Sequence, residues 1–189
     1  SDSQSLDNML EVYLMGGLDP LHAMRLLMPP AWQGIDAMDP DLRAFYEFYA
    51  PHLEPWDGPA GVVLTDGRYA CCALDRNGLR PARYVITKDR HLTVASEIGV
   101  WDYKPEDVER KGRMGPGQMI ALDLQTGTLL ENDDINELLK TRHPYKVWLK
   151  KGVKYLESDL IDPSLAAEPM DRRTLSTYRK MFNITAEER

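Results

Sequence analysis

The amino-acid sequence predicts an α+β fold, because two kinds of hydrophobic periodicity follow one another along the chain. Apolar residues recur at helical spacing within residues 1–50, whereas short apolar runs separated by turn sequences occupy residues 60–130. The length of 189 residues, with 43% hydrophobic and 28% charged residues, is typical of one globular domain or of one domain with an appendage. We therefore expect a core that helices and strands share.

Three helices are expected before residue 50. Ser5 is a candidate N-cap of the first helix, which the Gly16-Gly17 pair would end. An aspartate followed by a proline marks the start of the other two, because proline is favoured at the first helical position. These pairs are Asp19-Pro20 and Asp39-Pro40.

Roughly six strands are expected after the helices, and turn sequences join several of them. Asp66-Gly67 is a hairpin signal between the first two strands, and further turns are expected at residues 88–90 and 125–127. The candidate strands are residues 60–65, 69–74, 83–87, 91–95, 119–122 and 128–130.

The remainder of the chain predicts a helix, a linker and a second helix. Residues 133–142 carry apolar side chains on one helical face, and residues 155–173 are rich in acidic residues, prolines and small residues. Thr174 is a candidate cap for the final helix.

Charge and hydropathy limit what the protein can bind. The formal net charge of −7 argues against nucleic acid as a partner, since phosphate binding needs clustered Lys and Arg. The longest apolar runs are far shorter than the roughly 20 residues that span a bilayer, and no signal peptide pattern opens the chain. We therefore expect a soluble cytoplasmic protein. The missing initiator Met indicates processing or a piece of something longer.

The cysteines and histidines do not form a metal-binding pattern. Cys71 and Cys72 are adjacent on a candidate strand, so their side chains should point to opposite faces as buried, reduced thiols. No third thiol exists for an iron–sulfur cluster, and the four histidines show no ligand spacing. We therefore expect no metal site in this chain.

The first two residues are the most suggestive candidates for chemistry. Ser1 invites comparison with hydrolases that use the first residue as nucleophile, but it precedes a polar run and a helix, so we interpret it as the point where this piece begins. Asp2 has two readings that the residues alone leave open. It could serve local turn and capping chemistry, which spacing favours, or it could hold the ammonium group of a ligand.

Three further segments are interpreted as structural turns. Asn77-Gly78 should form a tight turn, with the flanking arginines paired to carboxylates in preference to an anionic ligand. The glycine-rich residues 112–117 follow no clear strand and contain a proline that lacks a donor, so they are not a phosphate cradle. Residues 54–59 should pack an aromatic side chain between the helical and strand parts. The residues alone thus predict an α+β domain without a complete catalytic set.

Five strings, taken together and in order, closely resemble the large subunit of glutamate synthase. The residues 75–81 and 95–97 also look like other type 2 glutamine amidotransferases. The five strings are residues 1–3 (SDS), 5–8 (SLDN), 54–60 (EPWDGPA), 75–84 (DRNGLRPARY) and 95–99 (ASEIG).

This resemblance implies a fold and a reaction. The implied fold is an N-terminal nucleophile hydrolase sandwich with αββα layers and antiparallel sheets, here incomplete. The implied reaction is hydrolysis of L-glutamine to glutamate and ammonia, which then reacts reductively with 2-oxoglutarate to give a second glutamate. By the same resemblance the parent enzyme holds FMN and a 3Fe-4S cluster, which this chain would not bind, and works with a small electron-supplying subunit.

The resemblance also assigns roles along the chain. Residues 1–154 would be the C-terminal part of the amidotransferase domain, 155–173 a linker and 174–189 the start of the central domain, each working with the rest of the same polypeptide. The nucleophilic cysteine and the oxyanion hole would precede Ser1, so no catalytic residue is assigned and the chain alone is expected to be inactive. Asp2 matches the carboxylate that binds the α-ammonium of glutamine. The alternative is a non-catalytic amino-acid-binding or regulatory module.

Overall fold

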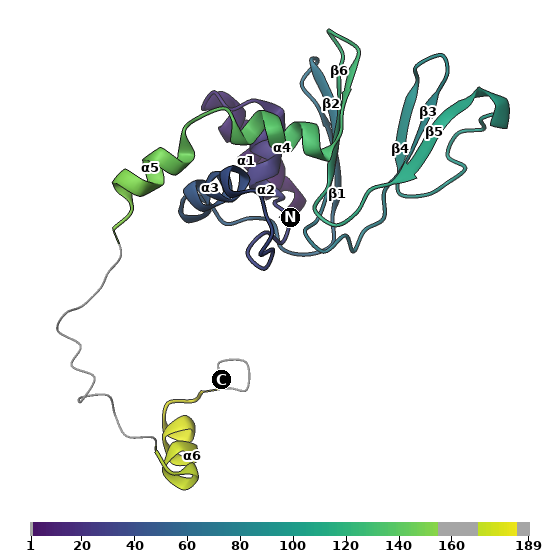
Figure 1. Cartoon of the computed structure of the whole chain (residues 1–189). Helices are drawn as coiled ribbons and strands as arrows, with labels where there is room; N and C mark the ends of the chain where they lie inside the picture. The colour runs from purple at the N-terminus through teal and green to yellow at the C-terminus, as the bar shows by residue number, and fades with distance from the viewer. Residues whose placement is uncertain (1, 155–169, 185–189) are drawn as a thin grey trace. The chain divides into compact units, whose positions relative to one another are not determined.

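The computed structural model describes residues 2–154 and 170–184. The chain divides into two compact units, Ser1–Val153 and Lys154–Arg189. Of the described elements, the first unit holds helices α1 to α5 and strands β1 to β7, and the second holds helix α6 (Figure 1).

Three helices open the first unit, and two of them begin at the predicted Asp-Pro pairs. The Asp19 carboxylate accepts a hydrogen bond from the His22 amide at 3.1 Å, and the Asp39 carboxylate accepts bonds from two amides of the next turn. The first helix begins earlier than predicted, so Ser5 lies inside it and is not its N-cap. An acidic Asp2 in the first turn favours this earlier start. The helices are α1 (Asp2–Met15), α2 (Pro20–Leu27) and α3 (Pro40–Tyr49).

Four antiparallel strands form a first sheet, sheet A, in the order β1-β2-β6-β7. The predicted hairpin joins β1 to β2, and Gly67 adopts a positive φ of 89° at its turn. All four strands coincide closely with predicted ones. Their bounds are Gly61–Thr65, Tyr69–Leu74, Met119–Asp123 and Thr128–Leu130 for β1, β2, β6 and β7.

Three further strands form sheet B, in the order β4-β3-β5, and one of them is absent from the sequence prediction. Strands β3 (Arg83–Thr87) and β4 (Leu92–Ala95) were expected, but β5 (Val108–Arg113) was not. Its charged sequence lacks the apolar alternation that marks a half-buried strand, and pairing with β3 supplies the missing stabilisation. Gly112 stands opposite Tyr84, and a Cβ at Gly112 would lie 2.6 Å from the Tyr84 ring carbon that bears the hydroxyl. A side chain at this position would therefore require the end of the Tyr84 side chain to move.

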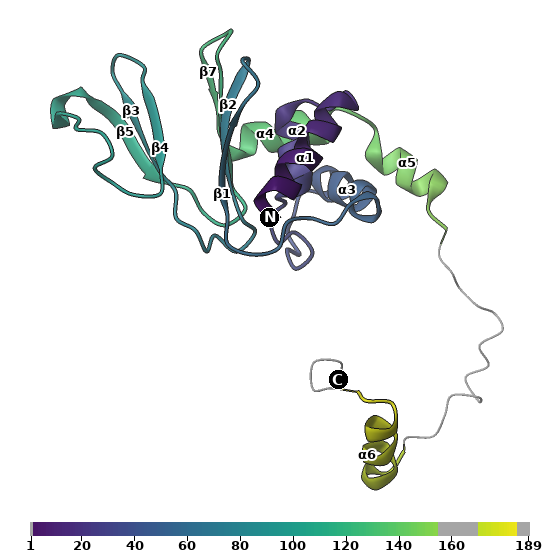
Figure 2. The ribbon, with the colours of Figure 1, turned by 180° about the vertical axis from the view of Figure 1, so that it is seen from behind.

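The elements of the first unit form three layers, with sheet A in the middle. Figures 1 and 2 show α1, α2, α3 and α4 on one face of sheet A and sheet B on the other. The alternating side chains of β2 follow this arrangement. Cys71 and Ala73 join the core beneath the helices, whereas Cys72 and Leu74 join a smaller core toward sheet B. This confirms the predicted fold class, helices with antiparallel sheets, and the described residues supply one of the two helical layers of an αββα sandwich.

Three more α-helices follow the strands: α4 (Asn132–Lys140), α5 (Tyr145–Gly152) and α6 (Arg172–Met181). The short helix α5 was not predicted. It packs against α3 through Tyr145, whose ring lies edge-on to the Phe45 ring with 5.5 Å between the ring centroids. Helix α6 is capped by Asp171 and not by Thr174, because the Asp171 carboxylate accepts the Arg173 and Thr174 amides. Most of the predicted linker, residues 155–169, lies outside the described residues.

Unpaired strand edges and uncovered apolar side chains mark the first unit. Strand β1 ends sheet A, and Val63 on this strand is 70% exposed. Strands β4 and β5 end sheet B, and Trp101, in the segment between them, is 68% exposed. Such edges and patches recruit other chains.

We therefore expect the isolated 189-residue chain to associate or to be marginally stable. Light scattering and thermal melting at several concentrations should show mass and melting temperature that depend on concentration. Val63→Lys should reduce association because a charge blunts the β1 edge, whereas Val12→Lys, at an exposed position of α1, should not. A sharp, reversible and concentration-independent melting transition of a monomer would contradict this expectation.

Candidate functional site

Asp2, the predicted substrate contact, is the first residue of helix α1. Its carboxylate is exposed, and it lies where the partial positive charge of a helix start favours an anion. An exposed, negatively charged group at a fixed helical position can accept hydrogen bonds from a ligand ammonium. Ser1, the other candidate at this end, lies outside the described residues.

The two thiols are buried in β2, as the sequence predicts, and are unsuited to nucleophilic attack. Cys71 and Cys72 are free, and they enter different cores on opposite faces of the strand. Burial raises the pKa of Cys71 to about 12, with smaller contributions from Cys72 and Asp66, and burial raises the pKa of Cys72 to about 11. Since the thiolate is the reactive form of cysteine, burial disfavours nucleophilic attack by either side chain.

A buried aspartate organises the loop that carries the chain from sheet A to sheet B. The Asp75 carboxylate accepts hydrogen bonds from four backbone amides, those of Ala60, Asn77, Leu79 and Arg80, at 3.0–3.2 Å. Burial alone would raise the pKa of Asp75, but these four donors together hold the pKa below its usual value. The carboxylate is thereby held ionised and fully occupied by the backbone, which is a structural role.

Gly78 and Arg76 of this loop follow the structural interpretation, whereas no described carboxylate lies within ion-pair distance of Arg80. Gly78 adopts a positive φ of 60°, and a Cβ there would lie 2.9 Å from the Cα of Pro116. Arg76 pairs with the exposed Asp57 carboxylate at 3.0 Å, which confirms the favoured pairing for this arginine. Surface pairs of this kind contribute little to stability.

The glycine-rich turn before β6 has no amides left to bind a phosphate. The Gly117 amide donates to the Asp75 carbonyl at 2.9 Å, and the Gly115 amide donates to the Gln118 side-chain oxygen at 2.7 Å. The prediction of a turn holds from Met114 onward, whereas Gly112 and Arg113 belong to β5.

The segment before β1 joins the helical layer to sheet A. The Trp56 amide donates to the Leu27 carbonyl at the end of α2 at 2.7 Å, and the indole N–H donates to the Gly58 carbonyl at 3.1 Å. The half-buried ring packs against the larger core. This confirms the predicted packing role of residues 54–59.

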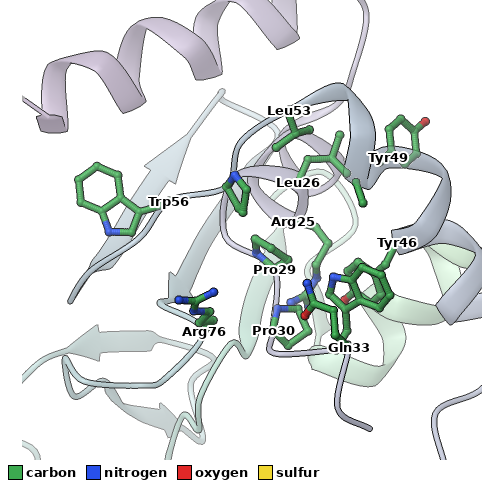
Figure 3. A pocket seen from close by; sticks show the side chains of 13 residues that line it. Arg25, Leu26, Pro29, Pro30, Gln33, Tyr46, Tyr49, Leu53, Trp56 and Arg76 are labelled. Carbon is green, nitrogen blue, oxygen red and sulfur yellow. The ribbon is translucent and has the colours of Figure 1, made fainter. Parts of the chain in front are cut away.

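Sequence reasoning missed one polar residue in the core, Arg25 of helix α2. It is fully buried and lines a cavity in the helical layer (Figure 3). Its signal in the sequence is weak, because one arginine on a short apolar helix is usually read as part of a solvated face.

The described part of the chain shows neither a cluster of metal ligands nor a helix that could span a membrane. Residues 2–154 and 170–184 contain no group of three or more His, Cys, Asp or Glu side chains that could hold a metal ion. His22 is buried against aromatic rings, and burial, together with the Arg142 charge, lowers its pKa to about 4. Within the same residues no helix is long and apolar enough to cross a bilayer.

Comparison with known proteins places this arrangement in a family. Residues 1–148 match the family of class-II glutamine amidotransferases. The chain belongs to this family. Its fold, with helices on one face of an antiparallel sheet and a second sheet on the other, agrees with the sandwich that the resemblance implied.

The relatives of this amidotransferase chain confirm the resemblance to glutamate synthase large subunits. It is 38% identical over 188 residues to the glutamate synthase [NADPH] large chain of Bacillus subtilis (strain 168) and 39% identical over 191 residues to the chloroplastic ferredoxin-dependent glutamate synthase of Oryza sativa subsp. japonica. It is 40% identical over 192 residues to the ferredoxin-dependent glutamate synthase 2 of Synechocystis sp.. Each match covers 100% of this chain and 12% of the relative, so the chain spans about an eighth of their length.

Replacing Asp75 with Asn is expected to lower the free energy of unfolding by at least about 2 kcal/mol at neutral pH, because it disrupts a buried network around a charged acceptor. Urea unfolding followed by circular dichroism at one fixed protein concentration measures this change. Asp57→Asn is the matched control. It removes an exposed carboxylate from the neighbouring surface pair and should have a far smaller effect.

The difference in unfolding free energy between wild type and Asp75→Asn should also depend on pH. Because the folded-state pKa of Asp75 is depressed, its stabilisation is present above about pH 4, the usual aspartate value, and is lost as the pH falls through the folded-state pKa. The stability difference between wild type and Asp75→Asn should therefore shrink below about pH 4. His22 titrates equally in both proteins and cancels. A difference that stays constant or grows toward low pH would contradict the assigned role.

Proposed function

We propose that this chain works as part of the glutaminase half of a glutamate synthase large chain. In the complete enzyme, L-glutamine would be hydrolysed to glutamate and ammonia, and the ammonia would combine with 2-oxoglutarate under reduction to form a second glutamate. The family match over residues 1–148 and the relatives that align over the whole chain support this proposal. Relatives that are about eight times longer than the chain support a place for it within a longer polypeptide.

Within this function, Asp2 is the residue that we assign to substrate binding. Its carboxylate would accept charge-assisted hydrogen bonds from the α-ammonium of glutamine and so fix which end of the substrate faces the reacting amide. The exposed position in the first turn of α1 supports this assignment. Such a contact orients the substrate and breaks no bond, so another part of the polypeptide must supply the nucleophile.

A second part of the proposal concerns the activity of the chain alone, and the burial of both thiols is the observation that carries it. The resemblance implies that the reaction uses a cysteine nucleophile, and both cysteines of this chain are buried, protonated and held in β2. We therefore propose that the 189 residues alone do not hydrolyse glutamine. The oxyanion hole would likewise lie elsewhere in the polypeptide.

The cofactors of the parent enzyme would also lie elsewhere. The side chains of Cys71 and Cys72 enter different cores on opposite faces of one strand, so they do not fit as joint ligands of an iron–sulfur cluster. The amides of the glycine-rich turn are already bonded, so this turn does not fit the phosphate of FMN. We assign FMN, the 3Fe-4S cluster and the contact with an electron-supplying subunit to other parts of the parent.

The proposed division of the chain follows the same reasoning. Residues 1–154 would complete the amidotransferase domain, 155–173 would link it onward, and 174–189 would begin the central domain. The separation of the two compact units after Val153 and the end of the family match at residue 148 support this division.

Asp2→Asn in the full-length enzyme is expected to raise the KM for glutamine roughly tenfold or more, because a charge-assisted bond contributes about 1.5–3 kcal/mol. Steady-state glutaminase kinetics measure this change. Glutamate synthesis from added ammonia should stay unchanged, since it bypasses the glutamine site. Asp7→Asn, an exposed aspartate of the same helix, should leave both reactions unchanged. An unchanged KM in Asp2→Asn would refute the role of Asp2.

The isolated 189-residue chain is expected to release no ammonia from glutamine above background. If it does release ammonia, and Ser1→Ala abolishes this activity, the chain is a hydrolase in its own right and the proposal of inactivity is wrong. If the chain instead binds glutamine without hydrolysis and loses binding in Asp2→Asn, a regulatory amino-acid-binding module replaces the enzyme-fragment reading.

A further inference from the structure

The outer face of sheet B, which points away from sheet A, is covered by no described helix of the first unit (Figures 1 and 2). Tyr84 and Val94 pack toward sheet A in the smaller core, so the strand residues that alternate with them point outward. The strand register places these outward residues in two rows across the sheet. The first row is Ala95, Arg83 and Arg113, and the second is Thr93, Val85 and Lys111.

The segment that follows β4 folds back over this outer face, and the two together line a cavity of about 450 Å³. The Tyr103 and Thr93 hydroxyls share a hydrogen bond that ties the segment to the sheet. Three apolar side chains of the segment line the cavity and remain largely in solvent: Ile98 is 78% exposed, Val100 57% and Trp101 68%. Neighbouring exposed apolar side chains mark an interaction surface, and tryptophan often dominates the binding energy of such a surface.

Three cations line the same cavity without a counter-charge. Arg83, Lys111 and Arg113 are exposed, and no described carboxylate lies within ion-pair distance of any of them. Arg83 stands directly opposite Arg113 in the strand register, and like charges in this position are destabilising. Among the described residues that line the cavity, Glu97 is the only acidic one. The outer face is therefore locally positive, although the chain as a whole is negatively charged.

These charges specify what can cover the outer face. Water solvates the three cations as long as the face is exposed. A partner that covered the face would remove this water, and burying the cations without opposite charges would be costly. The partner must therefore bring carboxylates for the cations and apolar side chains for Val100 and Trp101. Nucleic acid would meet the cations, but the net charge of −7 would repel it.

We propose that the outer face of sheet B binds an acidic segment of the longer polypeptide. Its carboxylates pair with Arg83, Lys111 and Arg113, and its apolar side chains pack on Trp101. This inference rests on the proposed function, because that function places the chain within a longer polypeptide. Relatives about eight times longer than the chain support a partner of this origin, and an open sheet face is normally buried by a further layer of the same domain.

Lysine acetylation of the full-length enzyme, measured by mass spectrometry, tests this surface. We expect Lys111 to react at least about tenfold more slowly in the folded enzyme than in the urea-unfolded enzyme, because the acidic segment covers it. A carbodiimide joins an amine to a carboxylate that it contacts. It should therefore cross-link Lys111 to an Asp or Glu outside these 189 residues, and the product should keep the mass of one polypeptide on a denaturing gel.

Charge reversal tests the sign of the partner. The double variant Arg83→Glu with Arg113→Glu should make Lys111 of the folded enzyme react at least about threefold faster, because it repels an acidic segment. Lys88→Glu is the matched control. Lys88 is exposed in the turn between β3 and β4 and does not line the cavity, so its reversal should leave the protection of Lys111 unchanged.

Three results would overturn the proposal. They are acetylation of Lys111 at the unfolded rate, a cross-link from Lys111 to a second polypeptide, and protection that appears only after poly(U) RNA is added. None of these readouts depends on glutamine hydrolysis. An enzyme with glutaminase activity and an unprotected Lys111 would contradict this inference alone, whereas a protected Lys111 without glutaminase activity would contradict the proposed function alone.

Discussion

The buried carboxylate of Asp75 is the interaction on which the rest of the amidotransferase unit depends. The carboxylate accepts hydrogen bonds from the amide that precedes β1 and from three amides of the connection between the two sheets. The backbone carbonyl of Asp75 accepts a further bond from the Gly117 amide before β6. One residue therefore fixes three chain segments that are distant in sequence. Because β2 leads into this loop and β3 follows it, the position of sheet B against sheet A depends on the same charge.

The packing of β2 between two cores decides where chemistry can occur. Its alternate side chains face the helices and sheet B, so both thiols serve as small apolar side chains and lose access to solvent. Asp2 offers an exposed negative charge at a helix start. We propose on this basis that the unit positions the substrate and that the attacking group lies elsewhere in the polypeptide.

Local signals in the sequence predicted the elements that local interactions determine. The Asp-Pro pairs predicted the starts of α2 and α3, and the short apolar run in β3 predicted its bounds. Strand β5 and helix α5 escaped prediction because their stability comes from distant partners, the β3 backbone and Phe45. The role of Asp75 and the burial of Arg25 could not be predicted either. Both depend on hydrogen bonds to backbone groups that only the fold brings together. The role of Asp2 came from a resemblance and not from its spacing.

A structure of the longer polypeptide with bound glutamine would test the central claim most directly. Our account predicts that the Asp2 carboxylate lies within about 2.7–3.2 Å of the α-ammonium nitrogen. It also predicts that the reacting amide carbon lies against a group outside these 189 residues, with both β2 thiols still buried. Glutamine bound far from Asp2, or with its amide carbon against Cys71 or Cys72, would contradict the account.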